Sequence, residues 1–263
     1  MKRASLLGTG LAVVMALTLA GSALAAAFTN GGFANTANTF VDYGTTINLG
    51  RLVGYDELDA GSTTSPTSAT AIPGWTVTSG NVDWNYTYFQ APPGYSYSVD
   101  LDGTEEGAIS QTFDTTFGAT YVVQFWLAGN PDPNSYCDSL PDPSACDSPA
   151  TKTLTVQATG APASLYSFDA TGFTDQSMGW IAASAYSFLA SGSSTTLTFT
   201  STTPGAFGPV IGGVSVTQEA ISTGAQCKDG GWKTMTDNNN QPFKNQGDCV
   251  SFYAVGGAVP IGN

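Results

Sequence analysis

The chain contains no histidine in its 263 residues. Histidine is the usual general base beside a serine or cysteine nucleophile and the commonest protein ligand of transition metals. Its absence therefore excludes a catalytic triad of the ordinary kind. The sequence also lacks a glycine-rich loop with the spacing of a phosphate-binding or dinucleotide-binding motif, so nucleotide binding has no support.

Basic residues are scarce as well. Seven Lys and Arg stand against 20 Asp and Glu, which gives a formal net charge of −13 at pH 7. So acidic a chain lacks the positive surface that attracts nucleic-acid backbones and anionic lipids. We therefore expect neither nucleic acid nor a membrane among its partners. Charged residues make up only 10% of the chain, too few for helices with ion-paired faces.

Long hydrophobic runs are missing except at the N-terminus. Lys2 and Arg3 precede an apolar run from Leu6 to Ala20, and the small-residue triplet 23–25 follows it. The run, about 15 residues long, is shorter than the roughly 20 residues that span a bilayer. The pattern predicts a cleaved secretory signal peptide over residues 1–25, with an uncleaved membrane anchor as the alternative. The mature protein is then expected to be extracellular, either free or held at a cell wall by non-covalent contacts.

Cysteine occurs only four times, as the local pairs Cys137 with Cys146 and Cys227 with Cys249. In an exported chain four cysteines predict two disulfides, and pairing by proximity is the first expectation among three connectivities. A four-cysteine zinc site is the alternative, although zinc favours shorter paired spacings. The sequence therefore predicts disulfides and no metal site.

The chain is rich in short alternating runs of Thr, Val, Tyr and Phe. Period-2 alternation recurs over 96–101, 108–113, 120–127, 152–158, 195–200 and 210–217. Turn signals such as Ala-Pro-Pro-Gly at 91–94 separate these runs. No sustained helical repeat with caps follows the signal peptide. The predicted fold class is therefore all-β, an antiparallel sandwich.

Composition divides the rest of the chain into two parts. Residues 26–219 form the predicted sandwich, which is long enough to bury one substantial core. Within it, residues 35–71 are interpreted as a long insertion with one short strand around 47–53. Residues 220–263 hold three lysines and the pair Cys227 and Cys249. We expect them to form a small separate module bracketed by a disulfide.

Seven aromatic residues lie within 23 positions: Trp75, Trp84, Tyr86, Tyr88, Phe89, Tyr95 and Tyr97. Such a surface suits a sugar, because the C–H face of a pyranose stacks on a ring while amides and carboxylates bond its hydroxyls. The candidate carbohydrate-binding residues are Asp83, Trp84, Tyr86, Tyr88 and Gln90. The alternative is that these rings fill the core, since aromatic residues are typical of strands. Among the rings, Trp84 and Tyr88 are expected to be the exposed ones.

Two acidic pairs stand close together in the chain. Asp100 and Asp102 share one face of a predicted strand, and Glu105 and Glu106 lie in the turn that follows. Paired carboxylates are the residues that cleave glycosidic bonds, and they also bind cations. The plainer interpretation is that they are solvated residues at a strand end and a turn. No catalytic residue is assigned.

An ordered series of motifs runs through the predicted sandwich. It consists of Asn30-Gly31-Gly32-Phe33, 72–84, 98–103, 109–113, 127–132 and 195–211. Through these motifs the chain resembles the bacterial choice-of-anchor C proteins, relatives of the plant cell-wall domain of unknown function 642 (DUF642). The resemblance covers nearly all of residues 28–217. It implies a galactose-binding-like jelly roll, an architecture that many carbohydrate-binding modules share.

Two positions depart from the pattern of that family. Its members commonly have an acidic residue after the Asn-Gly-x-Phe motif and an aspartate in the last strand, where such residues can help to hold a structural calcium ion. Here the two positions are Ala34 and Gly212. Calcium prefers several hard oxygen ligands with carboxylates among them. We therefore expect neither calcium nor any other cofactor.

These observations predict a non-catalytic secreted protein whose partner is a polysaccharide or cell-wall glycan. One alternative is a structural or adhesive surface protein that binds other proteins through its threonine-rich sheet faces. A second alternative is a glycan hydrolase that uses paired carboxylates. A fold shared with binding modules does not by itself establish a ligand.

Overall fold

The computed structural model describes residues 26–34, 54–64, 67–116, 118–131, 148–219, 227–228, 230–237 and 241–254. The predicted signal peptide lies outside the described residues, and so do Cys137, Cys146 and the strand predicted around 47–53. No helix in the described part of the chain is long and apolar enough to cross a membrane.

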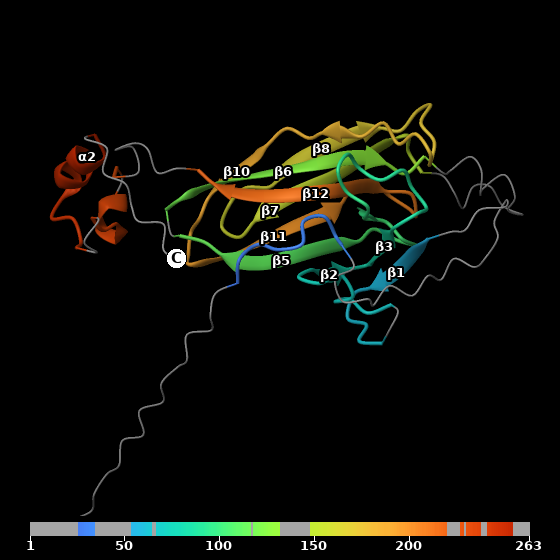
Figure 1. Ribbon diagram of the computed structural model, residues 1–263, viewed down its shortest axis with the longest axis horizontal. Helices are drawn as coiled ribbons and strands as arrows, with labels where there is room; N and C mark the ends of the chain where they lie inside the picture. The colour runs from blue at the N-terminus through green and yellow to red at the C-terminus, as the bar shows by residue number, and fades with distance from the viewer. Residues whose placement is uncertain are drawn as a thin grey trace, which may run out of the picture.

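The strands form two antiparallel sheets that pack face to face (Figure 1). The larger sheet has the order β1-β3-β4-β12-β6-β10, and β9 also pairs with β6. Its strands are β1 Tyr55–Asp59, β3 Asn81–Asn85, β4 Ser98–Asp100, β12 Pro209–Gln218, β6 Thr120–Gly129, β10 Tyr186–Leu189 and β9 Ile181–Ala182. Successive strands such as β5, β6 and β7 alternate between the sheets, as expected for a jelly roll.

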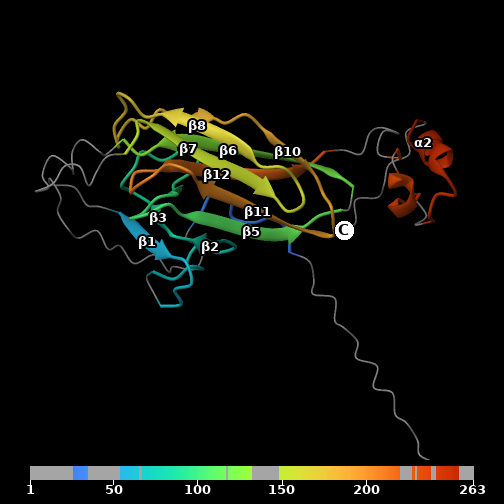
Figure 2. The same ribbon diagram turned by 180° about the vertical axis from the view of Figure 1, so that it is seen from behind.

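The smaller sheet has the order β2-β5-β11-β7-β8, and Figure 2 shows the same two layers from behind. Its strands are β2 Thr76–Ser79, β5 Ala108–Asp114, β11 Ser194–Ser201, β7 Thr151–Ala158 and β8 Ser164–Asp169. The six predicted runs correspond to β4, β5, β6, β7, β11 and β12. The predicted all-β antiparallel jelly-roll sandwich is therefore confirmed.

Alternation along the strands explains how the core forms. In β7 the side chains of Leu154 and Val156 are buried, whereas Thr153 and Thr155, which alternate with them, are partly exposed. Successive side chains of a strand point to opposite faces, so this pattern buries one face against the other sheet. In the core, Phe125 meets Phe199 edge to face with 5.2 Å between their centroids.

The N-terminal segment 26–34 is held by two tryptophans. The Nε1 of Trp75 donates to the main-chain oxygen of Asn30 at 3.0 Å, and the Nε1 of Trp84 donates to that of Phe33 at 2.9 Å. Phe33 and Trp84 are 0% exposed. The prediction that Trp84 is an exposed ring is therefore wrong. In β3, alternation places Val82 and Trp84 on the same face of the sheet, and this face packs against the core.

The C-terminal part has a small apolar cluster of its own. The 3₁₀ helix η3 spans Gly231–Thr234 and α2 spans Gln246–Ala254. The predicted disulfide between Cys227 and Cys249 is present, and both cysteines are buried together with Phe243. This cluster is distinct from the core of the sandwich.

Candidate functional site

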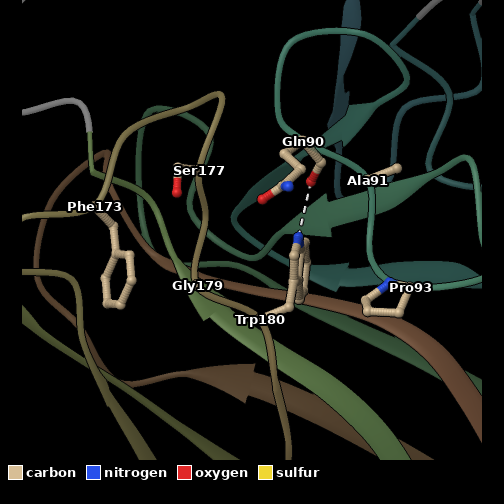
Figure 3. A pocket seen from close by; sticks show the side chains of 7 residues that line it. All are labelled: Gln90, Ala91, Pro93, Phe173, Ser177, Gly179 and Trp180. Atoms are coloured by element: carbon tan, nitrogen blue, oxygen red, sulfur yellow. Dashed lines mark hydrogen bonds between the residues drawn. The ribbon is translucent and has the colours of Figure 1, made fainter.

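A pocket of about 460 Å³ lies between two loops that are far apart in the sequence (Figure 3). One loop joins β3 to β4, and the other joins β8 to β9. The pocket is lined by Gln90, Ala91 and Pro93 from the first loop and by Phe173, Ser177, Gly179 and Trp180 from the second. It therefore combines two aromatic rings with an amide and a hydroxyl.

Gln90 ties the two loops together through three hydrogen bonds. Its main-chain N–H donates to the oxygen of Asp175 at 2.6 Å. Its side-chain Oε1 accepts from the N–H of Met178 at 2.9 Å. Its main-chain oxygen accepts from the Nε1 of Trp180 at 2.8 Å, the contact drawn in Figure 3. The last of these bonds holds the indole in place before any ligand arrives, and an ordered ring lowers the entropic cost of binding.

The second loop has its own local order. The backbones of Thr174 and Ser177 exchange two hydrogen bonds of 3.2 and 2.8 Å. Phe173 is 37% exposed, and its ring lies 5.4 Å from that of Phe168. A β-carbon on Gly179 would collide with the Phe173 ring, and Gly179 has a φ of +67°. A glycine at this position therefore allows the ring to lie against the backbone.

The first loop packs directly on β12. A β-carbon on Gly212 would lie 2.5 Å from Cγ of Pro92, and one on Gly213 would collide with the ring of Tyr95. The pairing of β12 with β6 shifts register between Gly212 and Ser215, which marks a β-bulge. Two consecutive glycines thus make room for the loop that carries Gln90.

The two positions at which the resemblance implies calcium ligands, Ala34 and Gly212, have other surroundings here. Pro92 occupies the space in front of Gly212, where an aspartate side chain would begin. Near Ala34, the side chain of Asn30 closes the turn: its Oδ1 accepts from Ala34 N at 2.7 Å and its Nδ2 donates to Ala34 O at 3.1 Å. Neither position supplies a carboxylate, which calcium sites usually include.

Of the five predicted carbohydrate-binding residues, only Gln90 lines the pocket. Trp84 is in the core, and Tyr88 is partly buried with its ring 5.4 Å from that of Tyr55. Tyr86 is 47% exposed and stacks on Tyr97. The predicted cluster is therefore divided between the core, the pocket and the exposed stack of Tyr86 on Tyr97.

Asp83, the fifth predicted residue, lies in a row of carboxylates on the larger sheet. In the strand register Glu57 faces Asp83, and Asp83 faces Asp100. Burial raises the pKa of Asp83 well above its ordinary value, and the charges of Asp100, Glu57 and Asp102 raise it further. Asp83 therefore does not line the pocket. It belongs to a row of carboxylates in which burial and neighbouring negative charges favour the protonated form of its side chain.

Asp100 and Asp102 are both fully buried, so their interpretation as solvated residues is wrong. Asp100 accepts from Asn130 Nδ2 at 2.7 Å and from Gly208 N at 3.2 Å. Burial raises the pKa of Asp100 to about 7 and that of Asp102 to about 8. Burial also lowers the pKa of the neighbouring Lys152 to about 8. Enclosed in this way, the aspartate pair has no access to a glycosidic bond.

The other acidic pair behaves as the plainer interpretation predicts. Glu105 and Glu106 are exposed in the turn after β4.

Among the residues that the structure describes, no group of three or more Cys, Asp or Glu side chains could hold a metal ion.

Sequence reasoning missed Phe173, Ser177 and Trp180. They lie in the stretch 172–180, Gly-Phe-Thr-Asp-Gln-Ser-Met-Gly-Trp, which has no strand alternation. Two aromatic residues that directly follow glycines outside any alternating run were the available signal. Loops that carry such residues are where binding sites concentrate.

Several solved structures resemble the chain. A family 35 carbohydrate-binding module from Paenibacillus barcinonensis is 16% identical with a TM-score of 0.36, over 56% of this chain and 94% of that one. A family 35 module from Clostridium thermocellum is 12% identical with a TM-score of 0.34, over 56% and 89%. A module of Cellvibrio mixtus lichenase 5A in complex with cellotriose is 12% identical with a TM-score of 0.32, over 56% and 88%.

No curated protein sequence matches the chain significantly. A family model does match, over residues 57–217. These residues hold both loops of the pocket and, within the described part of the chain, all twelve strands except the first two positions of β1 and the last position of β12. The chain therefore belongs to the family described as "Protein of unknown function (DUF642)".

Proposed function

We propose that this protein is a non-catalytic secreted protein that binds a polysaccharide or cell-wall glycan in the pocket between the two loops. The observation that carries the proposal is the hydrogen bond from Trp180 Nε1 to the main-chain oxygen of Gln90. It fixes an indole beside the amide of Gln90 and the hydroxyl of Ser177, which also line the pocket. A fixed ring with polar groups at its edge suits a pyranose, which has an apolar face and hydroxyls around its rim.

The polar groups have capacity for a ligand. The Oε1 of Gln90 accepts from Met178 N, whereas its Nε2 has two N–H groups and no hydrogen-bond partner among the described residues. The hydroxyl of Ser177 can donate and accept. An amide and a hydroxyl together can bond neighbouring sugar hydroxyls, so they supply orientation while Trp180 and Phe173 supply contact area.

A pull-down on insoluble polysaccharides, followed by a glycan array, tests the proposal. The full chain should be retained on at least one polymer, and Trp180→Ala should weaken retention about tenfold without lowering the melting temperature by more than a few degrees. Leu165→Ala is the matched control, because Leu165 is a 68% exposed apolar residue on β8, which is not part of the pocket. A folded protein that binds no glycan would contradict the proposal and favour the adhesive alternative.

We also propose that the protein is secreted and that it belongs to the choice-of-anchor C proteins. The N-terminal pattern of Lys2, Arg3 and the following apolar run supports export. The ordered motifs support a place among the choice-of-anchor C proteins. N-terminal sequencing of the protein recovered from culture medium should begin directly after Ala25. Retention of the intact N-terminus in the membrane fraction would favour an uncleaved anchor.

A further inference from the structure

We infer that Tyr95, together with Tyr86 and Tyr97, forms a second sugar-stacking subsite beside the pocket, and that the ligand is an extended neutral polysaccharide rather than a single terminal sugar. This inference rests on the proposed function, since it takes the pocket as the first subsite. The three tyrosines are called the tyrosine surface.

A tight turn connects the pocket to the tyrosine surface. Pro93 lines the pocket, and the N–H of Tyr95 donates to the oxygen of Pro92 at 3.0 Å. Gly94, between them, has a φ of +83°. These features define a β-turn, whose first and fourth α-carbons lie within about 7 Å of each other. Tyr95 is therefore next to the wall of the pocket.

The backbone holds the ring of Tyr95 in position. A β-carbon on Gly32 would lie 2.8 Å from Cδ1 of Tyr95, and one on Gly213 would collide with the same ring. The ring thus lies against two glycines from separate segments, and it is still 39% exposed. A ring fixed by backbone contacts loses little conformational freedom when a ligand stacks on it.

Tyr86 and Tyr97 lie at the two ends of the loop that also carries Tyr95. Their rings stack with centroids 5.0 Å apart and planes inclined by 28°. Tyr97 in turn contacts the core residue Trp84, with 5.7 Å between centroids. The stack therefore runs from the core to the exposed Tyr86, so the outer ring has a rigid support.

Charge selects among the glycans that could bind two aromatic subsites. The chain has a formal net charge of −13 at pH 7. A polyuronate or sulfated glycan would be repelled by this field. A neutral polysaccharide is not repelled by this field, and its successive sugars present C–H faces that can stack on successive rings.

Calorimetric titration with oligosaccharides of increasing length tests the inference. Neutral xylo-, galacto- and cello-oligosaccharides from disaccharide to hexasaccharide are the probes. Wild-type affinity should rise with length, and Tyr95→Ala should weaken hexasaccharide binding about tenfold while leaving disaccharide binding within about twofold. Tyr95→Phe should retain the affinity, because it keeps the ring. Leu165→Ala is again the matched control.

The outcomes separate this inference from the proposed function. If no oligosaccharide binds the wild-type protein, the proposed function fails and the second subsite fails with it. If Trp180→Ala weakens all lengths but Tyr95→Ala weakens none, the pocket stands and the second subsite is overturned. Equal losses for disaccharide and hexasaccharide in Tyr95→Ala also overturn it, because they would mean that Tyr95 only supports the pocket.

Discussion

Gly212 and Pro92 are packed so closely that a β-carbon on the glycine would lie 2.5 Å from Cγ of the proline. Carbon atoms make their best contact at roughly 3.5–4.0 Å, so any side chain here must displace the loop. We expect Gly212→Ala to lower the free energy of unfolding by about 1–3 kcal/mol, the usual cost of overpacking. Because the same loop carries Gln90, glycan retention should fall as well. Urea unfolding and the pull-down measure the two effects.

Gly192→Ala is the matched control for that substitution. A β-carbon on Gly192 would find its nearest neighbour, Ser194 O, at an ordinary 3.6 Å. Stability and binding should therefore remain close to wild type. Equal behaviour of the Gly212 and Gly192 variants would contradict the close packing of the loop on β12.

Trp84 and Tyr86 are two residues apart but should respond differently to truncation. Trp84 is enclosed in the core and bonds Phe33, so Trp84→Ala should cost about 3–5 kcal/mol of unfolding free energy. Tyr86→Ala removes a half-exposed ring and should cost about 1 kcal/mol or less. Thermal unfolding followed by circular dichroism distinguishes them. Similar melting temperatures for the two variants would contradict the burial of Trp84.

Stability should depend on pH through the buried aspartates. The pKa of Asp100 is raised from 3.8 to about 7 and that of Asp102 from 3.8 to about 8. Between these limits the folded protein binds protons that the unfolded chain has released, so the free energy of unfolding falls as the pH rises from about 4 to about 8. The pKa of Lys152 is lowered from 10.5 to about 8, which reverses the slope above about pH 8.

Asp102→Asn isolates one of these protons. An amide does not titrate, so the decline in the free energy of unfolding between pH 4 and 8 should become shallower by the share of one proton, about 1.4 kcal/mol per pH unit. Urea unfolding at each pH measures this slope. Glu105→Gln, which removes an exposed carboxylate from the turn nearby, is the matched control. An unaltered slope in Asp102→Asn would show that its carboxyl has an ordinary pKa in the folded state.

The C-terminal cluster should depend on its disulfide. Cys227 and Cys249 are 22 residues apart, and closing a loop of that length stabilises by about 3 kcal/mol in the chain-entropy model. The double variant Cys227→Ser and Cys249→Ser should lose protection from hydrogen exchange over 227–254. The sandwich has its own core and should keep its melting temperature. A fall in that temperature would mean that the cluster stabilises the sandwich.

Several features of the protein follow from the sequence alone. Alternation in runs such as 152–158 and 195–200 predicts strands wherever one face is buried, and β7 and β11 confirm it. The pair Cys227 and Cys249 predicts a disulfide because the two cysteines are close in the sequence. The absence of histidine excludes catalytic triads of the ordinary kind on composition alone. These are properties of composition and local pattern.

Only the tertiary structure decided which face of each alternating strand is buried. Alternation places Val82 and Trp84 on one face of β3, but only the packing of the second sheet determines that this face is buried. Asp100 and Asp102 resemble a solvated pair in the sequence, and it is Asn130 and Gly208 from distant segments that help to enclose Asp100. Period-2 alternation specifies a shared face and carries no information on what covers it.

The pocket is the clearest case. Gln90 stands in the aromatic region of the sequence, whereas Trp180 lies 90 residues later in a loop without alternation. Their hydrogen bond forms because the sandwich brings the β3–β4 and β8–β9 loops together. The sequence by itself determined that this is a β-sandwich rich in aromatic and polar side chains. Only the fold selected which of them meet, because contacts between distant loops depend on how the sheets pack and not on any local pattern.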